Sequence, residues 1–139
     1  MKKIEVDATV ENLDTVLEFV NEQLTEIECS AAAQMQIELA VEEIFVNIAS
    51  YAYYPKTGAV TVQVETMPEH PEIAITFIDS GIPYNPLDKA DPDITLSADE
   101  RAIGGLGIFL TKKTMDHVGY EYLDGKNVLT IEKKVKEQT

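Results

Sequence analysis

The sequence predicts an α/β (α+β) two-layer sandwich, in which helices cover one face of a mixed, mostly antiparallel sheet. Three kinds of pattern lead to this fold class: short runs that alternate apolar and polar residues, long stretches with apolar residues at helical spacing, and short connections between successive strands. The chain has 139 residues. We expect a single domain over residues 1–139, because domains cluster near ~100 to 150 residues.

The first part of the chain predicts a strand followed by two helices. Residues 3–10 alternate as an edge strand does, and a helix follows from about Asn12, with apolar residues at helical spacing. Residues 30–53 form the longest helical stretch, with Ser30 as its N-cap and Pro55 just beyond its end. The opening order is therefore strand, helix, helix.

The second part of the chain predicts a sheet interrupted by a long loop. Two strands, 59–66 and 72–79, are joined by a connection short enough for an antiparallel pair. Residues 80–103 carry three prolines and scattered acids without periodicity, so we expect a functional, mobile lid there. A glycine-led helix over 104–118 follows, and a hairpin that turns at an Asp-Gly pair closes the chain.

Composition and charge exclude several classes of protein. The longest apolar runs are too short for a membrane span, and the N-terminus lacks the features of a secretory signal, so we expect a cytoplasmic protein. The formal net charge is -14, which repels a phosphate backbone, and we expect no direct nucleic-acid binding. A bound polyphosphate would need backbone amides, helix N-termini and a divalent cation in place of lysines.

A Glu/Asn pair on the longest predicted helix is the first candidate site. Glu43 and Asn47, at i and i+4, project together from a strip between apolar neighbours, where both side chains would be partly desolvated. Asn47 can offer an uncharged oxygen to Mg²⁺, and Glu43 can orient or deprotonate an attacking hydroxyl. The alternative is that Glu43 is an ordinary surface acid at the margin of the core.

An acid at the end of a predicted strand is the second candidate. The strand 72–79 ends in Asp79, and Gly81 permits a tight backbone turn just after it. A carboxylate fixed there can accept a hydrogen bond from the exocyclic amine of adenine, which would select adenine over guanine. The alternative is a plain turn at the strand exit, which Asp and Gly often make.

A glycine-rich segment at a helix start is the third candidate. Gly104, Gly105 and Gly107 lead into the predicted helix, where free backbone amides can face phosphate oxygens and missing side chains permit close approach. The segment lacks the spacing and the Lys-Ser/Thr ending of a P-loop, and no strand directly precedes it. Its phosphate role therefore depends on the other two candidates.

Together and in this order, ExxxN on a helix, DSGIPYNP after a strand and GGLG at a helix start resemble the GHKL (Bergerat-fold) ATPases. The stretch from DSGIPYNP to GGLGIFLTKKTMD is similar to the anti-sigma-factor serine/threonine kinases in particular. The resemblance spans roughly residues 5–135. It implies the Bergerat ATP-binding fold, with ATP and Mg²⁺ as cofactors.

The resemblance also implies a role for each matching residue. Glu43 would be the catalytic base and Asn47 the magnesium ligand. Asp79 would bind adenine, Gly81 would shape the purine pocket, and Thr130, on the last strand, would lie near the adenine. The phosphates would contact the glycine segment, which is Gly104, Gly105, Leu106 and Gly107.

Two positions near these motifs depart from the family or add to it. Tyr51 stands one turn after Asn47, where many relatives carry a basic residue or His, so one phosphate contact would be missing or supplied otherwise. Arg101 lies just ahead of the glycine segment, and Lys112 and Lys113 lie just after it. We expect Arg101 to stabilise the transferring phosphoryl group.

The resemblance implies phosphoryl transfer from ATP to a serine or threonine of a partner protein. The partners would be a sigma factor, which is sequestered, and an anti-anti-sigma (STAS-type) protein, which is phosphorylated; a homodimer is also implied. The alternative is a non-catalytic, nucleotide-dependent binding switch of the same fold, which needs Asp79 but no base at Glu43. A third hypothesis, a structural module with a vestigial site, conflicts with intact motifs at three separate places.

Overall fold

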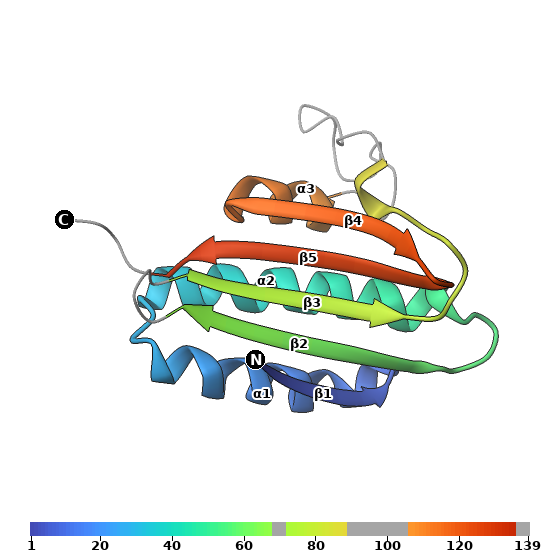
Figure 1. Cartoon of the computed structure of the whole chain (residues 1–139), viewed down its shortest axis with the longest axis horizontal. Coiled ribbons are helices and arrows are strands. Elements are labelled where there is room, and N and C mark those ends of the chain that lie inside the picture. Colours follow the sequence, from blue (N-terminus) through green and yellow to red (C-terminus); the bar gives the residue numbers. More distant parts are fainter. Residues whose placement is uncertain (68–71, 89–105, 136–139) are drawn as a thin grey trace.

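The computed structural model describes residues 1–67, 72–88 and 106–135 (Figure 1). In chain order, its elements are β1 (Lys2–Asp7), η1 (Val10–Asn12), α1 (Leu13–Glu26), α2 (Ala31–Asn47), η2 (Ile48–Ala52), β2 (Ala59–Met67), β3 (Glu72–Asp79), η3 (Pro86–Asp88), α3 (Leu106–Thr114), β4 (His117–Leu123) and β5 (Lys126–Lys134). The five strands form one sheet in the order β1-β2-β3-β5-β4. Each neighbouring pair of strands is antiparallel. The predicted two-layer α/β class is confirmed.

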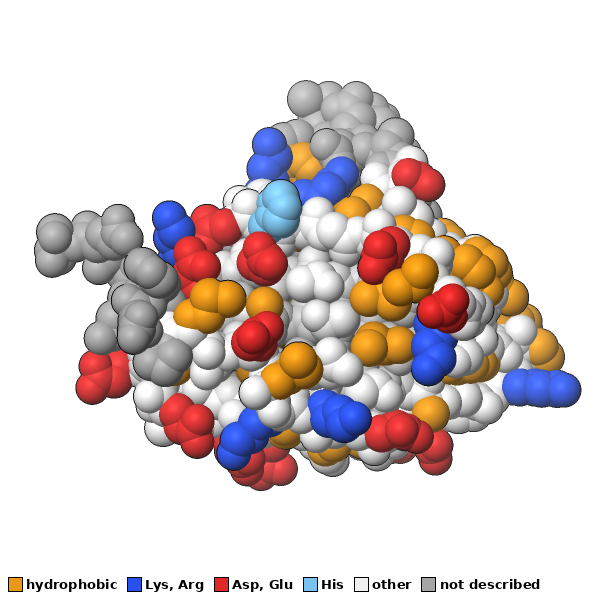
Figure 2. Space-filling view, in the orientation of Figure 1, with side chains coloured by type: hydrophobic (Ala, Val, Ile, Leu, Met, Phe, Trp, Pro, Cys, Tyr) orange, Lys and Arg blue, Asp and Glu red, His pale blue; other side chains and the backbone are white. Residues whose placement is uncertain are grey.

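The hydrophobic core lies between this sheet and the helices that cover one of its faces (Figure 1). Alternate residues of the three central strands point toward the helices and are buried: Val60, Val62, Val64, Ile73, Ile75, Phe77, Leu129 and Ile131. Full burial of one such side chain stabilises the fold by about 1.5–3 kcal/mol. The opposite face of the sheet carries acidic and basic side chains mixed together (Figure 2).

Helix α2 begins as the sequence predicts and ends differently. The Ser30 side chain caps it, because its Oγ accepts a hydrogen bond from the Ala33 N–H at 3.1 Å. After Asn47 the chain continues as the π-helical turn η2 instead of further α-helix. Such wide turns inside helices often occur at functional sites, and η2 directly follows the Glu43/Asn47 strip.

The helix predicted over 104–118 is too long at its C-terminal end. Helix α3 ends at Thr114, and β4 already begins at His117. The reason is tertiary pairing: the Asp116 N–H donates to the Glu132 carbonyl at 2.9 Å, and the Lys134 N–H donates to Asp116 Oδ2 at 2.6 Å. The first strand is also shorter than predicted, since β1 ends at Asp7.

The segment predicted to be a lid, 80–103, is described only over its first part. Residues 80–88 form turns and the short η3, and residues 89–103 lie outside the described part of the chain. The closing hairpin is confirmed, with Asp124 and Gly125 at φ of 53° and 78°, the left-handed values that a two-residue hairpin turn requires. Within the described ranges, no helix is both long and apolar enough to cross a membrane.

Candidate functional site

Asp79 occupies the end of β3, on the side of the sheet that faces the helices, and it is only 5% exposed. Its Oδ1 accepts hydrogen bonds from the Gly81 N–H and from the Asn127 side-chain amide, both at 2.9 Å. Among the described residues, no hydrogen bond reaches its Oδ2. One oxygen of Asp79 therefore fixes the carboxylate, and the other remains able to accept from a ligand.

Asn127 is a site residue that the sequence prediction missed. Its Nδ2 donates to Asp79 Oδ1 and to the Ile82 carbonyl at 2.8 Å, while its Oδ1 accepts from the Tyr84 N–H at 3.1 Å and from the Tyr120 hydroxyl. It lies directly opposite Asp79 in the β3–β5 register. One buried amide thus holds the carboxylate, the turn after β3 and strand β4 together.

Gly81 brings the turn after β3 against η2. A Cβ at this position would lie 2.2 Å from the carbonyl oxygen of Ala52, closer than side chains tolerate. The next residue, Ile82, donates its N–H to the same carbonyl at 3.0 Å. Gly81 is therefore needed for a close backbone approach, and this approach places the turn at the edge of the cavity beside Asp79.

Two tyrosines near this turn are held in their neutral form. Burial is the largest cause of the raised pKa of Tyr120, and the neighbouring Asp79 carboxylate raises it further. Burial also raises the pKa of Tyr53, whose hydroxyl accepts from the Ser80 N–H at 2.7 Å and donates to the Ala59 carbonyl at 2.6 Å. Both phenols keep their protons at neutral pH and can therefore donate these hydrogen bonds.

Glu43 and Asn47 lie side by side on α2, as their spacing predicts. Both are half-buried, and the Asn47 Nδ2 donates to Glu43 Oε1 at 3.2 Å. This hydrogen bond turns the amide nitrogen toward the carboxylate and leaves Asn47 Oδ1 available to a cation. An amide oxygen completed by phosphate and water oxygens is a usual environment for Mg²⁺, so the donors present fit the expected metal.

The first turn of α3 lies against the Glu43 carboxylate. A Cβ on Gly107 would lie 2.0 Å from Glu43 Cδ, so glycine leaves room for the Glu43 carboxylate in its present position. Leu106 is the first residue of α3. A groove of about 380 Å³ runs beside this contact, between α2 and α3. The remaining predicted residues of this segment, Arg101, Gly104 and Gly105, lie outside the described part of the chain.

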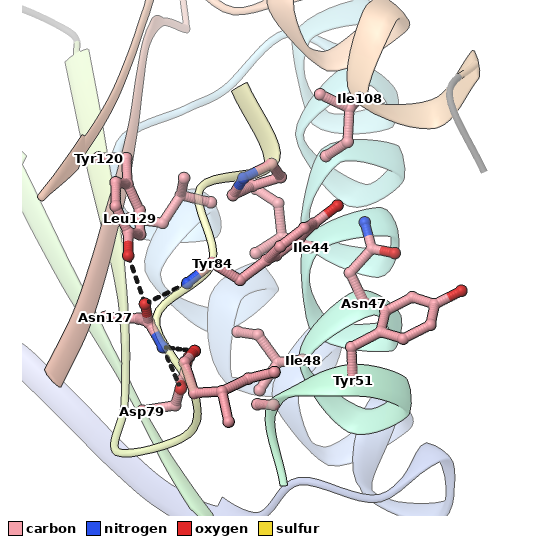
Figure 3. A pocket seen from close by; sticks show the side chains of 13 residues that line it. Ile44, Asn47, Ile48, Tyr51, Asp79, Tyr84, Ile108, Tyr120, Asn127 and Leu129 are labelled. Carbon is pink, nitrogen blue, oxygen red and sulfur yellow. Dashed lines mark hydrogen bonds between the residues drawn. The ribbon is translucent and has the colours of Figure 1, made fainter. Parts of the chain in front are cut away.

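A cavity of about 40 Å³ is lined by Asp79 and Asn127 and, from the second group, by Asn47 (Figure 3). Asp79 and Asn127 lie on one side and Asn47 on the other, with Ile44 and Ile48 of the helix forming an apolar wall between them. We name the Asp79, Gly81 and Asn127 group the base end, and the Glu43, Asn47 and Gly107 group the phosphate end, after the ligand parts expected there.

Thr130 does not belong to either group. It pairs with Thr76 across the sheet, with 3.1 Å between the two hydroxyl oxygens. Strand alternation points Asn127, Leu129 and Ile131 toward the helices and therefore points Thr130 to the opposite face. The structure therefore places Thr130 on the face of the sheet away from Asp79, and the β5 residue beside Asp79 is Asn127.

The chain belongs to the histidine kinase-like ATPase domain family, whose model matches residues 6–133. The two-layer fold is the one that the resemblance to GHKL ATPases led us to expect. The family assignment made from the sequence motifs is thus confirmed.

The chain is also similar to particular proteins. The chain is 28% identical over 102 residues to the serine/threonine-protein kinase BtrW of Bordetella bronchiseptica, covering 73% of this chain and 71% of BtrW. Its fold is similar to the RsbU and RsbW domains of Rv1364c from Mycobacterium tuberculosis, with a TM-score of 0.65, 15% identity and 99% of this chain covered. This chain spans about a third of that longer protein, 34%. The histidine kinase AdeS of Acinetobacter baumannii has a TM-score of 0.54 at 12% identity, with 99% of this chain and 70% of AdeS covered.

Proposed function

We propose that this protein is an ATP-dependent serine/threonine protein kinase that acts as an anti-sigma regulatory factor. The observation that carries the proposal is the position of the Glu43 carboxylate, next to Asn47 and against the first turn of α3. The family match and the similarity to BtrW, a protein named as a serine/threonine kinase, support ATP as the phosphoryl donor. The acceptor is a serine or threonine hydroxyl of a partner protein.

In this proposal each end of the site has one task. At the base end, Asp79 Oδ2 accepts a hydrogen bond from the exocyclic amine of adenine, and the bonds at Oδ1 hold the carboxylate in place. At the phosphate end, Asn47 Oδ1 would hold Mg²⁺ together with oxygens of the nucleotide. When bound, Mg²⁺ neutralises charge on the phosphates during transfer.

Glu43 acts on the acceptor. Its carboxylate accepts the proton of the attacking hydroxyl, the hydroxyl oxygen forms a bond to the γ-phosphorus, the bond to the β–γ bridging oxygen breaks, and ADP leaves. The hydrogen bond from Asn47 orients the carboxylate for this step. In this proposal, backbone amides at the start of α3, around Gly107, donate hydrogen bonds to phosphate oxygens.

The proposed partners follow from the resemblance to anti-sigma kinases. One is a sigma factor, bound and sequestered; the other is an anti-anti-sigma protein of the STAS type, which is the phosphorylated substrate. We also propose that the protein acts as a homodimer in the cytoplasm.

The experiment that tests the kinase assignment is Glu43→Gln with Glu42→Gln as its matched control. Glu42 is the neighbouring, exposed acid on the same helix. Phosphoryl transfer from Mg-ATP to the STAS-type proteins of the same organism is measured, together with nucleotide affinity by calorimetry. We expect Glu43→Gln to lower the transfer rate by about 10²–10⁴-fold with little change in affinity, and Glu42→Gln to behave as the parent.

Two other outcomes would contradict the proposal in different ways. Equal transfer rates for the parent and Glu43→Gln would show that Glu43 is not the base. A parent that binds Mg-ATP and its partners but transfers no phosphate to any of them would be the non-catalytic binding switch.

A further inference from the structure

The side chain of Tyr84 crosses the cavity between the two ends of the site. Figure 3 shows its ring reaching from the turn after β3 toward α2, with the hydroxyl directed to the side of Asn47. The backbone of Tyr84 is anchored, because its N–H donates to Asn127 Oδ1 at 3.1 Å. Among the described residues, its hydroxyl makes no recorded hydrogen bond. The residue is therefore fixed at its backbone and held by packing alone at its ring.

The cavity as it stands is too small for a purine. Its volume is about 40 Å³, which is room for about three water molecules at the 10–15 Å³ that each requires. Tyr84 lines this cavity together with Asp79 and Ile48. A base that bonds to Asp79 therefore needs space that the Tyr84 ring restricts.

A larger hollow adjoins this cavity, because Tyr51, Ile82 and Tyr84 line both. This depression of about 550 Å³ is lined by Ser50, Tyr51, Tyr54, Ile82 and Tyr84 itself. Tyr51 is 53% exposed and Tyr54 is 80% exposed, so two aromatic faces are available there without displacing any buried group. Aromatic rings pack well against each other in offset or edge-to-face arrangements, and exposed side chains change rotamer within nanoseconds.

We propose that Tyr84 is the gate of the base end: its ring occupies the cavity without nucleotide and moves to the tyrosine-lined depression when adenine binds. This inference rests on the proposed nucleotide site and adds the residue that controls entry to it. The apparent dissociation constant then equals the intrinsic one divided by the fraction of molecules with the gate open. Replacing Tyr84 by a residue without a ring leaves every molecule open, so the apparent dissociation constant falls to the intrinsic one.

The first test compares nucleotide affinities of three variants by calorimetry. Tyr84→Ala is expected to bind ADP and ATP about fivefold more tightly than the parent, by the same factor for both, because the gate acts at the base. Tyr84→Phe keeps the ring and is expected to bind as the parent does. Tyr122→Ala is the matched control, since Tyr122 is a 47% exposed tyrosine that does not line the cavity.

A second measurement follows the ring itself. The chain contains no tryptophan, so Tyr84→Trp supplies a single fluorescent reporter at the gate. Saturation with ADP is expected to shift its emission to longer wavelength and to increase quenching by acrylamide, because the ring moves to the more open depression.

The outcomes separate this inference from the proposed function. Weaker binding by Tyr84→Ala would mean that the ring stacks on the bound base, and it would overturn the gate while leaving the ATP site intact. Unchanged emission of Tyr84→Trp at saturating ADP would also overturn it. Failure of the parent to bind ADP or ATP at millimolar concentration would overturn the nucleotide site, and the gate with it.

Discussion

The two ends of the site are built in different ways. At the base end, hydrogen bonds from Asn127 join the last residue of β3, the turn after it and strand β4 into one network. At the phosphate end, the recorded hydrogen bond between described side chains is the one from Asn47 to Glu43, and α3 approaches them through Gly107. The base end is thus organised by buried polar bonds, and the phosphate end by the close approach of two helices.

This difference has a consequence for function. A network of satisfied, buried hydrogen bonds is rigid, and the loss of one member leaves others unpaired. Base-end variants should therefore change folding stability and nucleotide affinity together. Side chains at the phosphate end are half-buried, so changes there that keep the helices together should alter phosphoryl transfer with less effect on stability.

The largest effect on stability is expected for Asn127→Ala. The change removes both halves of a buried amide and leaves the Tyr84 N–H, the Ile82 carbonyl and the Tyr120 hydroxyl without their partner. We expect a loss of about 3 kcal/mol in the free energy of unfolding, measured in urea, with weaker nucleotide binding. The control is Thr130→Val on the open face of the sheet, for which nucleotide affinity should stay unchanged. Loss of affinity in Thr130→Val but not in Asn127→Ala would reverse this assignment of the base end.

A slightly smaller effect is expected for Asp79→Asn, measured as nucleotide affinity. An asparagine keeps an oxygen for the Gly81 N–H but replaces one carboxylate oxygen by an amide that donates hydrogen bonds. A donor facing the adenine amine leaves both unpaired, so we expect ADP to bind about a hundredfold more weakly, consistent with the loss of a charge-assisted hydrogen bond. Asp88→Asn, at an exposed acid of η3, is the control. An equal decrease in both variants would point to overall charge and not to a specific contact.

A site residue could be predicted from the sequence where the pattern that indicates it lies within a single helix or strand. The Glu43/Asn47 pair follows from helical spacing alone, and the end of β3 at Asp79 follows from the alternating pattern before it. Asn127 carried a weaker signal: it is a polar residue on the inward face of β5, in line with Leu129 and Ile131. Its role became visible only through the register that places it opposite Asp79, which a pattern within one strand cannot supply.

The errors in the fold have the same origin. The resemblance to a family motif predicts Thr130 near the adenine, whereas the alternation along β5 directs its side chain to the opposite face of the sheet from Asp79. The start of β4 was hidden because residues 115–118 continue an acceptable helical pattern, and the hydrogen bonds of Asp116 to β5 decide between the two structures. Local propensity was overridden by tertiary pairing in that segment.

The close approach at the phosphate end predicts a different result for two glycines. In Gly107→Ala the new Cβ would overlap the Glu43 carboxylate, which must shift α3 or the acid, and we expect a loss of about 2 kcal/mol in unfolding free energy together with slower phosphoryl transfer. In Gly119→Ala on β4 the Cβ would meet no atom within 4 Å, so stability should be equal or slightly higher. Thermal unfolding of the two variants measures the contrast. Equal stability of both variants would show that α3 does not need its present contact with Glu43.

The smallest effect is the pH dependence of the base end. Because burial raises the pKa of Tyr120, the folded protein binds this proton more tightly than the unfolded chain, whose tyrosines titrate near their usual value of about 10. The stability due to Tyr120 is therefore fully present below about pH 10 and is lost as the pH rises through the folded pKa. Tyr120→Phe cannot lose a proton, so its urea midpoint should fall less than the parent's between neutral pH and pH 11. Parallel curves for the two proteins would mean that Tyr120 titrates alike in the folded and unfolded states, and that its hydroxyl is not held by Asn127.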